Sequence, residues 1–486
     1  MRIKKIAASL FTLGMAASPF AHATNGMNLE GYGPIAESMG GASMAYDNGV
    51  AAVMNNPATL GLMKDGSSDV GAGLGILAPR ITSKAGGASA DSSATAFYMP
   101  AAGYAHKSGQ WTYGAAAFSQ GGMGTEYAGN SFVAAGSGQT VRSEVGVGRF
   151  IVPLVYQMND KVTIGGSLDF VWAGMDLKMA LTGAQFLDMA GPSFGPTFQQ
   201  TYGSVSGSMM TAFAGAVGAG QMNPLNPVNW GYFNFSDNSQ FTGFAKGNGF
   251  AEKIGFTYKV SPQLTIGGTY HTKTAIGDLN ANGASVSFNA NMDNGVLAGG
   301  APNGTYSAVT IPVTGKISVK NFQWPETYGF GMAYQASDAM LLLADYKRIG
   351  WKSVMKDFNM TFTADSTQGN PLATGFGGTT LNATLIQNWD DQNVFEFGIA
   401  YKTSDVLTLR GGLNLANNPV PDKYMNPLFP AIAKNHVTLG FGYAVSQQSS
   451  VDFSYVYVPK VTATNGQSVT VDFGGYSGQL VYRYVY

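Results

Sequence analysis

The chain ends on Gly478-Gln-Leu-Val-Tyr-Arg-Tyr-Val-Tyr486, a stretch in which apolar and polar residues alternate. Successive side chains of an extended strand point to opposite faces. One face therefore carries Leu480, Tyr482, Tyr484 and Tyr486, and the other carries Gln479 and Arg483. Outer-membrane β-barrels have such strands, because the apolar face meets lipid while tyrosines lie near the headgroups. A soluble protein rarely leaves a terminal edge strand so unprotected. The final strand therefore predicts an all-β, membrane-spanning barrel.

The first 23 residues have the pattern of a secretory signal peptide. Arg2, Lys4 and Lys5 form a basic start, residues 6–17 form an apolar core, and Ala21-His-Ala23 offers small residues for cleavage. The alternative is an N-terminal membrane anchor, but the apolar core is too short to span a bilayer comfortably. We therefore expect residues 1–23 to be removed, so that the exported chain begins at Thr24.

Composition argues against several classes of site. The chain has no cysteine, which excludes disulfides and cysteine-based metal or redox chemistry, and its four histidines are too scattered for a local metal site. The formal net charge of −1 shows no basic excess for nucleic acid. Glycine accounts for 66 of the 486 residues, about twice its usual share of ~7 %, which suits strands packed in a membrane. We expect no metal, no cofactor and no nucleic-acid partner.

No segment after the leader is apolar for long enough to form a membrane-spanning helix. The longest apolar runs, such as residues 339–344, fall far short of the roughly 20 residues required. Open sheet edges are unsolvated in lipid, so a chain that spans the membrane with strands must close them into a barrel.

Six hairpins are predicted by short polar turns between runs of period two. The turns are Lys107-Ser-Gly109, Gln157-Met-Asn-Asp160, Val260-Ser-Pro262, Gln335-Ala-Ser-Asp338, Thr403-Ser-Asp405 and Ser446-Gln-Gln-Ser449. A first strand near residues 69–80 and the closing strand bring the prediction to about 14 antiparallel strands, within a barrel domain of residues 67–486. An even number puts both barrel ends on the periplasmic side and the longer loops outside.

The longer connections are roughly residues 173–249, 276–324, 351–391, 417–434 and 459–472. The first of these is unusually apolar for an external loop. We predict that it forms a groove for a hydrophobic ligand, lined by Phe186, Leu187, Met189, Phe198, Tyr202, Met209, Met210 and Phe213. Simple packing of the loop would explain the same residues equally well.

The lumen-facing strand positions carry several charged or titratable side chains. They are Asp169, His271, Glu396, Arg410, Asp452 and Arg483. These residues could line a solute path, but opposite charges across a barrel interior more often tie strands together. We favour the structural interpretation.

Residues 24–66 do not alternate as a barrel strand does. The segment is small and apolar, and it contains Gly40-Gly41-Ala42 and Asn56-Pro57-Ala58. A barrel of fourteen strands is wider than the eight whose side chains fill the interior, so it needs a plug unless it is an open pore. We predict that this segment folds into the lumen.

Several stretches in order along the mature chain resemble FadL-type outer-membrane transporters of long-chain fatty acids and aromatic hydrocarbons. Gly40-Gly41-Ala42, the stretch 47–54 and Asn56-Pro57-Ala58 followed by Leu60 match the N-terminal hatch of that family. The later matches are Gly121-Gly-Met-Gly-Thr-Glu-Tyr127, Tyr346-Lys-Arg-Ile-Gly-Trp-Lys-Ser353, Trp389-Asp390-Asp391 and Asn418-Pro-Val-Pro-Asp422.

The resemblance implies passive uptake of hydrophobic molecules through a hatch-plugged barrel. External loops would capture the ligand, the hatch (Gly40, Gly41, Asn56, Pro57, Ala58) would gate it, and a kink in the third strand would release it sideways. The kink maps to Gly121 and Gly122, where glycine lets the backbone bend. The expected partners are the ligand, outer-membrane lipid and, through the C-terminal strand, the barrel-assembly machinery, and the resemblance suggests a monomer.

Three alternative functions fit the sequence less well. A hydrophilic general porin with inward-folded loops would need an open polar lumen. A membrane hydrolase lacks support, because no Gly-x-Ser-x-Gly elbow is present and no catalytic residue can be assigned. An adhesin should have polar loops. The substrate stays open: a carboxylate would need an inner cation, for which Arg142, Arg149, Lys316 and Lys320 are candidates.

Overall fold

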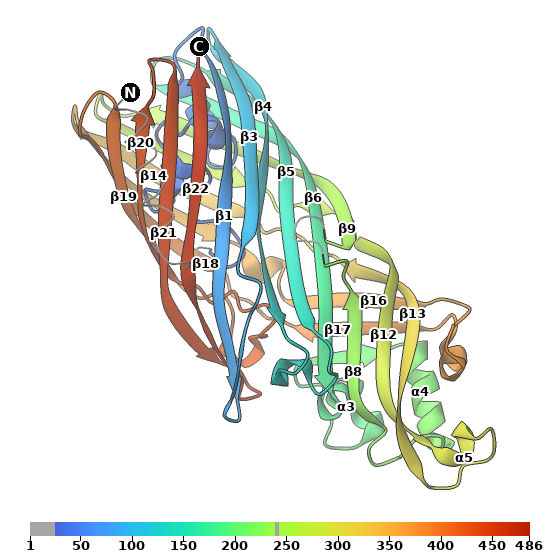
Figure 1. The fold of residues 1–486 in the computed structure, drawn as a ribbon. Helices are drawn as coiled ribbons and strands as arrows, with labels where there is room; N and C mark the ends of the chain where they lie inside the picture. The colour runs from blue at the N-terminus through green and yellow to red at the C-terminus, as the bar shows by residue number, and fades with distance from the viewer. Residues whose placement is uncertain (1–24, 239–242) are drawn as a thin grey trace, which may run out of the picture.

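The computed structural model describes residues 25–238 and 243–486, so the predicted signal peptide lies outside the described residues. The chain forms a closed antiparallel β-barrel (Figure 1). Pairing of the last strand with the first closes the ring. In ring order the strands are β1 (Ser68–Ala85), β3 (Phe97–Ser108), β4 (Trp111–Tyr127), β5 (Val141–Gln157), β6 (Val162–Thr182), β9 (Ala245–Lys259), β10 (Leu264–His271), β14 (Thr327–Ser337), β15 (Met340–Ile349), β18 (Gln392–Lys402), β19 (Leu407–Ala416), β20 (Asn435–Ala444), β21 (Ser449–Thr464) and β22 (Thr470–Val485).

All six predicted hairpins are present, and each joins neighbouring ring strands. Their turns lie at the end of the barrel at which the C-terminus lies (Figure 1). The polar turn residues and the period-two runs therefore predicted this end of the barrel correctly.

The segments predicted as long loops contain further strands. These extend the wall beyond the ring in the order β6–β8–β12–β13–β16–β17–β7. Their bounds are β7 (Gly203–Ser206), β8 (Val228–Phe235), β12 (Leu279–Asp293), β13 (Tyr306–Lys320), β16 (Asp357–Ala364) and β17 (Thr380–Ile386), with β2 (Ala88–Asp91) and β11 (Ala275–Ile276) as short additions. The structure thus has more strands than the about fourteen predicted. For example, β12 contains several asparagines and a glycine, which are typical of turns, so its sequence did not predict a strand.

The helices are short. In chain order they are α2 (Pro34–Glu37), η1 (Gly49–Val53), η2 (Pro57–Leu62), η3 (Phe132–Ala134), α3 (Gly183–Ala190), η4 (Pro192–Phe194), α4 (Ser208–Gly218), α5 (Asn294–Leu297), η5 (Trp351–Ser353), η6 (Pro371–Phe376) and η7 (Asp422–Tyr424). None of the helices among the described residues is long and apolar enough to cross a membrane.

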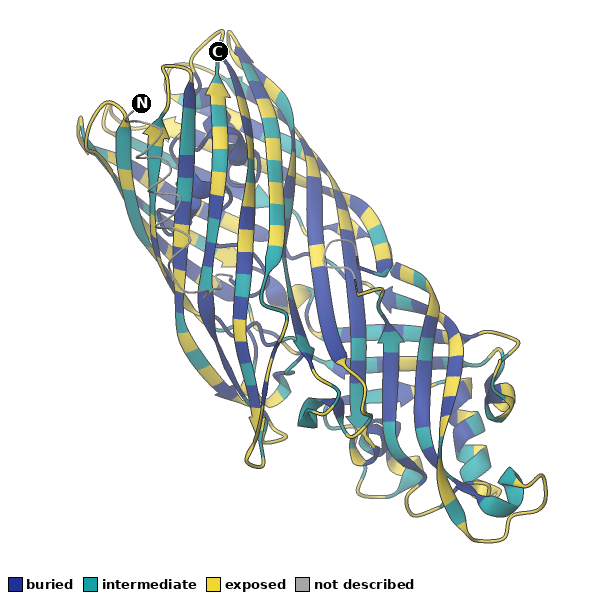
Figure 2. Ribbon diagram, in the orientation of Figure 1, coloured by how far each residue is buried: buried dark blue, intermediate teal, exposed yellow. Residues whose placement is uncertain are grey.

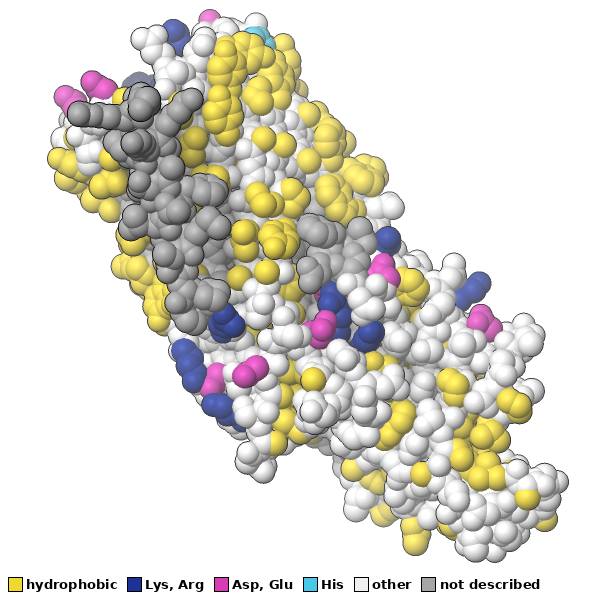
Figure 3. All heavy atoms as spheres, viewed as in Figure 1, with side chains coloured by type: hydrophobic (Ala, Val, Ile, Leu, Met, Phe, Trp, Pro, Cys, Tyr) yellow, Lys and Arg dark blue, Asp and Glu magenta, His cyan; other side chains and the backbone are white. Residues whose placement is uncertain are grey.

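Exposed and buried residues alternate along the ring strands (Figure 2). On β22 and the residue after it, Leu480, Tyr482, Tyr484 and Tyr486 are exposed while Gln479 is buried, as the alternation predicted. The exposed side chains of this and neighbouring strands form the broad apolar surface in Figure 3. This surface provides the lipid-facing belt of a barrel.

The N-terminal segment, residues 25–66, is almost entirely buried. It bonds to strands on opposite sides of the ring: Asn56 Nδ2 donates to the carbonyl of Phe256 on β9 at 3.0 Å, and Asn414 Nδ2 on β19 donates to the carbonyl of Gly40 at 2.9 Å. Figure 1 shows its short helices among the ring strands near the C-terminus.

Candidate functional site

Strand β4 loses its partner on one side halfway along its length. It pairs with β3 from Trp111 to Phe118, whereas its ladder with β5 continues to Tyr127. The remaining part of β3, from Phe97 to Pro100, pairs with β1 alone. A register shift between Ser119 and Gly121 marks a bulge at this point. The described wall is therefore interrupted between β3 and β4.

The N-terminal segment covers the interrupted edge from inside. The Gly122 N–H donates to the carbonyl of Met27 at 3.1 Å, and Asn28 forms a bridge with Gly121. A Cβ on Gly121 would lie 2.1 Å from the Met27 carbonyl oxygen, so this contact requires glycine. Trp324 Nε1 donates to Asn28 Oδ1 at 2.5 Å. The two glycines predicted from the resemblance thus lie where the segment meets the break.

A cavity of about 520 Å³ lies at the break. Two of its lining residues, Leu77 and Ile81, are buried on the face of β1 that points to the lumen. Others, including Trp172 and Phe170, are exposed on the outer face. The cavity therefore reaches both faces of the wall. An engineered cavity of about 150 Å³ in another protein holds benzene, so this one has room for a small aromatic molecule.

The outer part of the cavity lacks side chains on three neighbouring strands. Gly122 on β4 pairs with Gly146 on β5, which pairs with Gly174 on β6, and all three line the cavity. A Cβ on Gly146 would have no atom within 4 Å. The register of three glycines thus leaves a shallow path across the outer wall.

A row of buried polar side chains contacts the bulge from the lumen side. Gln120, the extra residue of the bulge, accepts a hydrogen bond from Arg149 Nε, and Arg149 Nη1 lies 2.7 Å from Asp169 Oδ2. Asp169 also pairs with Lys253 on β9. The side chains of Arg149, Asp169 and Lys253 are at most 1 % exposed. These polar side chains therefore link the bulge to β5, β6 and β9.

Both ends of this row of polar side chains contact the N-terminal segment. The Tyr32 hydroxyl donates to the carbonyl of Gln120 at 2.8 Å. At the other end, His271 pairs in register with Lys253, and its Nε2 lies 2.8 Å from the carbonyl oxygen of Asn55. Asn55 Nδ2 in turn donates to the carbonyl of Tyr32 at 2.9 Å. The bulge and the N-terminal segment are thus joined by one network of polar contacts.

The other charged residues predicted to face the lumen also make structural contacts. Glu396 pairs with Lys347 at 2.7 Å, Arg410 with Asp452 at 2.7 Å, and Arg483 with Asp69 at 2.7 Å. The first and third pairs join neighbouring strands, and the Arg410–Asp452 pair reaches across β20, as the structural interpretation of the sequence expected.

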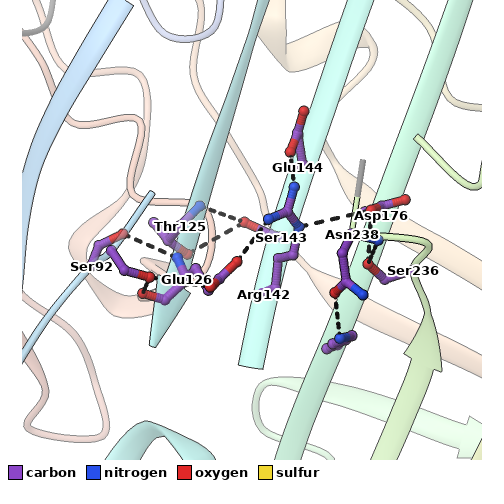
Figure 4. Close-up of polar contacts among 11 residues, drawn as sticks. Ser92, Thr125, Glu126, Arg142, Ser143, Glu144, Asp176, Ser236 and Asn238 are labelled. Atoms are coloured by element: carbon purple, nitrogen blue, oxygen red, sulfur yellow. Dashed lines mark hydrogen bonds and ion pairs between the residues drawn. The ribbon is translucent and has the colours of Figure 1, made fainter. Parts of the chain in front are cut away.

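A second polar cluster lies beside the cavity on the outer face of β4, β5 and β6 (Figure 4). Arg142 Nη1 lies 2.7 Å from Glu126 Oε2, and the same guanidinium contacts Glu144 and approaches Asp176. Glu144 lines the cavity. Arg142, a candidate for binding a substrate carboxylate, is therefore already engaged by carboxylates of the chain.

The Asn56-Pro57-Ala58 motif anchors the N-terminal segment. Asn56 Oδ1 accepts the Ala58 N–H at 3.1 Å and caps η2, and its Nδ2 also donates to the carbonyl of Met44 at 2.7 Å. Gly40 and Gly41 have φ of 73° and 94°, and a Cβ on either would fall within 2.5 Å of a backbone carbonyl oxygen. The motif and the glycines thus fix how the segment packs.

Glu37 on α2 is fully buried and accepts hydrogen bonds from Ser454 and Ser477. Burial raises the pKa of the Glu37 carboxyl to about 7.

The residues predicted to line the external groove fall into two sets. Phe186, Leu187, Met209, Met210 and Phe213 are buried, and the Phe186 and Phe213 rings pack at 5.8 Å between centroids. Phe198 packs partly buried against the same cluster.

Met189 and Tyr202 instead line a second cavity of about 490 Å³ near the end of the extension. Lys423, Tyr424 and the segment 425–428 contribute to this cavity, although no sequence pattern assigned them a role. The family match at residues 418–422 lies directly before them and could have indicated that this part of the chain has a role. Among the described residues no group of three histidines, aspartates or glutamates could hold a metal ion.

The chain is similar to known outer-membrane transport proteins. The chain matches the family model described as outer membrane protein transport protein (OMPP1/FadL/TodX) over residues 13–480. The toluene transporter TodX of P. putida is 28 % identical, with a TM-score of 0.77 over 94 % of this chain and 99 % of that chain. The toluene transporter TbuX of Ralstonia pickettii is also 28 % identical, with a TM-score of 0.71 over the same shares.

A FadL homologue of Pseudomonas aeruginosa shares the fold at 14 % identity, with a TM-score of 0.64 over 95 % of this chain and 99 % of that chain. A curated relative from Chlorobium limicola, an uncharacterized protein in the 5' region of a phosphoenolpyruvate carboxykinase gene, is 50 % identical over 98 residues. That match covers 20 % of this chain, which spans 48 % of the relative's length.

Proposed function

Because this chain belongs to the FadL/TodX family of outer-membrane transport proteins, we propose that it takes up small, uncharged hydrophobic molecules and releases them sideways into the membrane. Members of the family are transport channels of the Gram-negative outer membrane, so the chain is neither an enzyme nor a general porin. A hydrophobic molecule gains little from an aqueous pore, and a path that opens into the membrane interior spares it the contact with water.

The cavity at the break in β4 is the observation that carries the lateral route. It is lined by residues of both faces of the wall, and its outer part crosses the three paired glycines at Gly122, Gly146 and Gly174. A molecule that enters from the lumen side would leave onto the lipid-facing surface without crossing water. The 490 Å³ cavity near the end of the extension, which includes Met189 and Tyr202, would capture it first.

The N-terminal segment acts as a hatch in this proposal. It blocks the lumen through its contacts on opposite sides of the ring and covers the break through Met27 and Asn28. Cargo in the lumen would displace residues 25–28 from the edge of β4, while the Asn56 motif keeps the rest of the segment in place. Such a gate needs only a local rearrangement, because just two backbone contacts join Met27 and Asn28 to β4.

The charges favour an uncharged cargo over a fatty acid. A carboxylate would need an unpaired cation along the path, yet each of the lumen-facing cations described above has a carboxylate partner: Arg149, Lys253, Lys347, Arg410 and Arg483. Of the remaining candidates, Lys320 pairs with Asp278 at 2.8 Å and Lys316 is exposed. TodX and TbuX are named toluene transporters, which agrees with a monoaromatic hydrocarbon.

The test is uptake by proteoliposomes that contain the purified barrel, with labelled toluene and labelled palmitate in parallel. Faster toluene uptake, together with near-silence in a planar bilayer, is the expected result. Preferential palmitate uptake would refute the uncharged substrate, and a large steady ion conductance would refute the hatch.

The proposal includes three properties of the mature protein. The leader is removed after Ala23, the C-terminal strand is read by the barrel-assembly machinery, and the barrel acts as a monomer in outer-membrane lipid. N-terminal sequencing and light scattering of the purified protein check the first and third. Assembly of a variant without Tyr486 checks the second.

A further inference from the structure

We propose that the outer face of the closing seam, β1 with β21 and β22, binds the phosphorylated headgroup of an outer-leaflet glycolipid. The site consists of Lys84, Lys460 and Arg80. It rests on the outer-membrane location of the barrel and is independent of the proposed transport route.

The site lies where the outer face changes from apolar to basic. Along β1 the outward side chains are Val70, Leu74 and Ile76, followed by Arg80 and Lys84. Figure 3 shows dark-blue Lys and Arg atoms next to the border of the apolar surface. A membrane boundary is expected at such a change, because apolar side chains meet acyl chains and cations meet headgroups.

Two ammonium groups converge on one carboxylate at this boundary. Lys84 Nζ and Lys460 Nζ each lie 2.6 Å from the same oxygen, Asp472 Oδ2. The lysine side chains are 47 % and 64 % exposed, whereas that of Asp472 is only 11 % exposed and also accepts a hydrogen bond from Thr462 at 2.7 Å. Each ammonium has three donors, so Asp472 positions the pair and leaves donors that point outward.

The backbone supports this arrangement. A bulge between Val458 and Val461 interrupts the ladder of β21 with β22 and presents Lys460 on the outer face. Lys460 lies over Gly474, where a Cβ would come within 3.0 Å of the Lys460 Cα. Arg80 is the register partner of Gly474 on β1. The missing side chain of Gly474 thus lets Lys460 approach β22 beside the outward row of β1 that carries Arg80 and Lys84.

Charge and position together favour a phosphorylated lipid as the occupant. Lys84 and Lys460 contact Asp472, Arg80 lies on the same outward row of β1, and Asp91, at the edge of the site, accepts a hydrogen bond from Thr82 at 2.6 Å. The site therefore keeps a net positive charge. A lipid held there places its acyl chains on the apolar rows of the same strands, which free phosphate cannot do. Basic residues near an anionic membrane surface each strengthen binding about fivefold.

The experiment measures binding of lipid A to the full-length purified barrel in detergent micelles by native mass spectrometry. The test variant is Lys84→Gln with Lys460→Gln, and the matched control is Arg348→Gln with Lys352→Gln, two other exposed basic residues that lie on β15 and in η5. Heat-modifiable gel mobility verifies that both variants fold. We expect bisphosphorylated lipid A to bind the test variant at least tenfold more weakly and the control less than twofold more weakly.

Two further measurements distinguish binding of a phosphorylated lipid from binding of the acyl chains alone or of free phosphate. Dephosphorylated lipid A should bind the wild type and the test variant equally, and millimolar inorganic phosphate should not displace bisphosphorylated lipid A. Equal losses in both double variants would refute a specific site in favour of a general basic belt. Displacement by inorganic phosphate would show a simple anion site and overturn the proposal.

Discussion

Filling the outer part of the wall cavity is the most direct way to test the lateral route, and Gly146→Trp does so with least damage. Leucine at Gly121 or Gly122 would place its Cβ 2.1 Å from a backbone oxygen and disturb the wall itself. Gly146 is exposed and lines the cavity, and a Cβ added there would meet no atom within 4 Å. The indole ring would therefore occupy the path while the ladders of β5 stay intact.

The size of the effect follows from the area that the cargo loses. An aromatic ring buries roughly 150 Å² or more, which at about 25 cal/mol per Å² stabilises the occupied cavity by about 4 kcal/mol. If the tryptophan takes that place, occupancy falls by up to roughly a thousandfold, since each 1.4 kcal/mol is a factor of ten. We expect toluene uptake to fall between tenfold and a thousandfold.

The assay is the initial rate of labelled toluene uptake by proteoliposomes with equal amounts of folded barrel. The matched control is Gly411→Trp, on the outward face of β19, where a Cβ would meet only ordinary contacts from 3.6 Å. Equal rates for the two variants would refute the route through the break in β4. Loss in Gly146→Trp alone would support it.

Three further predictions concern the N-terminal segment and the bulge. Asn56→Ala removes two donated hydrogen bonds and a helix cap, about 2–4 kcal/mol in all, so planar-bilayer leak conductance should rise; an unchanged conductance contradicts this anchor. Arg149→Met removes one partner of a buried ion pair, which costs up to roughly 3–5 kcal/mol, so amide exchange along β4 beyond the bulge should accelerate, while Arg410→Met, which breaks a pair away from the bulge, should leave β4 unchanged. Burial raises the pKa of Glu37 from its ordinary 4.5 to about 7, so the contribution of Glu37 to docking of the segment is complete below pH 4.5 and weakens as pH rises to about 7. Glu37→Gln should therefore reduce the pH dependence of the leak, and an unreduced dependence would exclude Glu37 as a source.

Local alternation of apolar and polar residues, together with the turn residues, was sufficient to predict the barrel. The final strand, Gly478–Tyr486, predicted which side chains face lipid, and the six polar turns located the hairpins at one end of the ring. Both signals are local, because side-chain direction in a strand depends only on parity and a tight turn only on its own residues. The resemblance further directed attention to Gly121 and Gly122, which lie at the break.

Local signals could not decide which lumen-facing residues meet. Tyr32 bonds to Gln120 across 88 positions, and Trp324 bonds to Asn28 across 296. Likewise, Arg142 was a candidate for the inner pocket, yet it lies on the outer face beside three carboxylates. A single register shift, such as the bulge at Gln120, exchanges the faces of every following residue, so parity counted along the sequence loses its meaning there.

The sequence by itself therefore determined that this chain is a strand-rich barrel with a lipid-facing belt, because those properties depend on residues a few positions apart. The tertiary structure alone decided where the wall is interrupted, which glycines lie side by side across it, and that Phe186 and Phe213 pack inward while Met189 and Tyr202 line a cavity. These features depend on the stagger of each strand against its neighbours around the whole ring. That stagger is fixed only when the barrel closes.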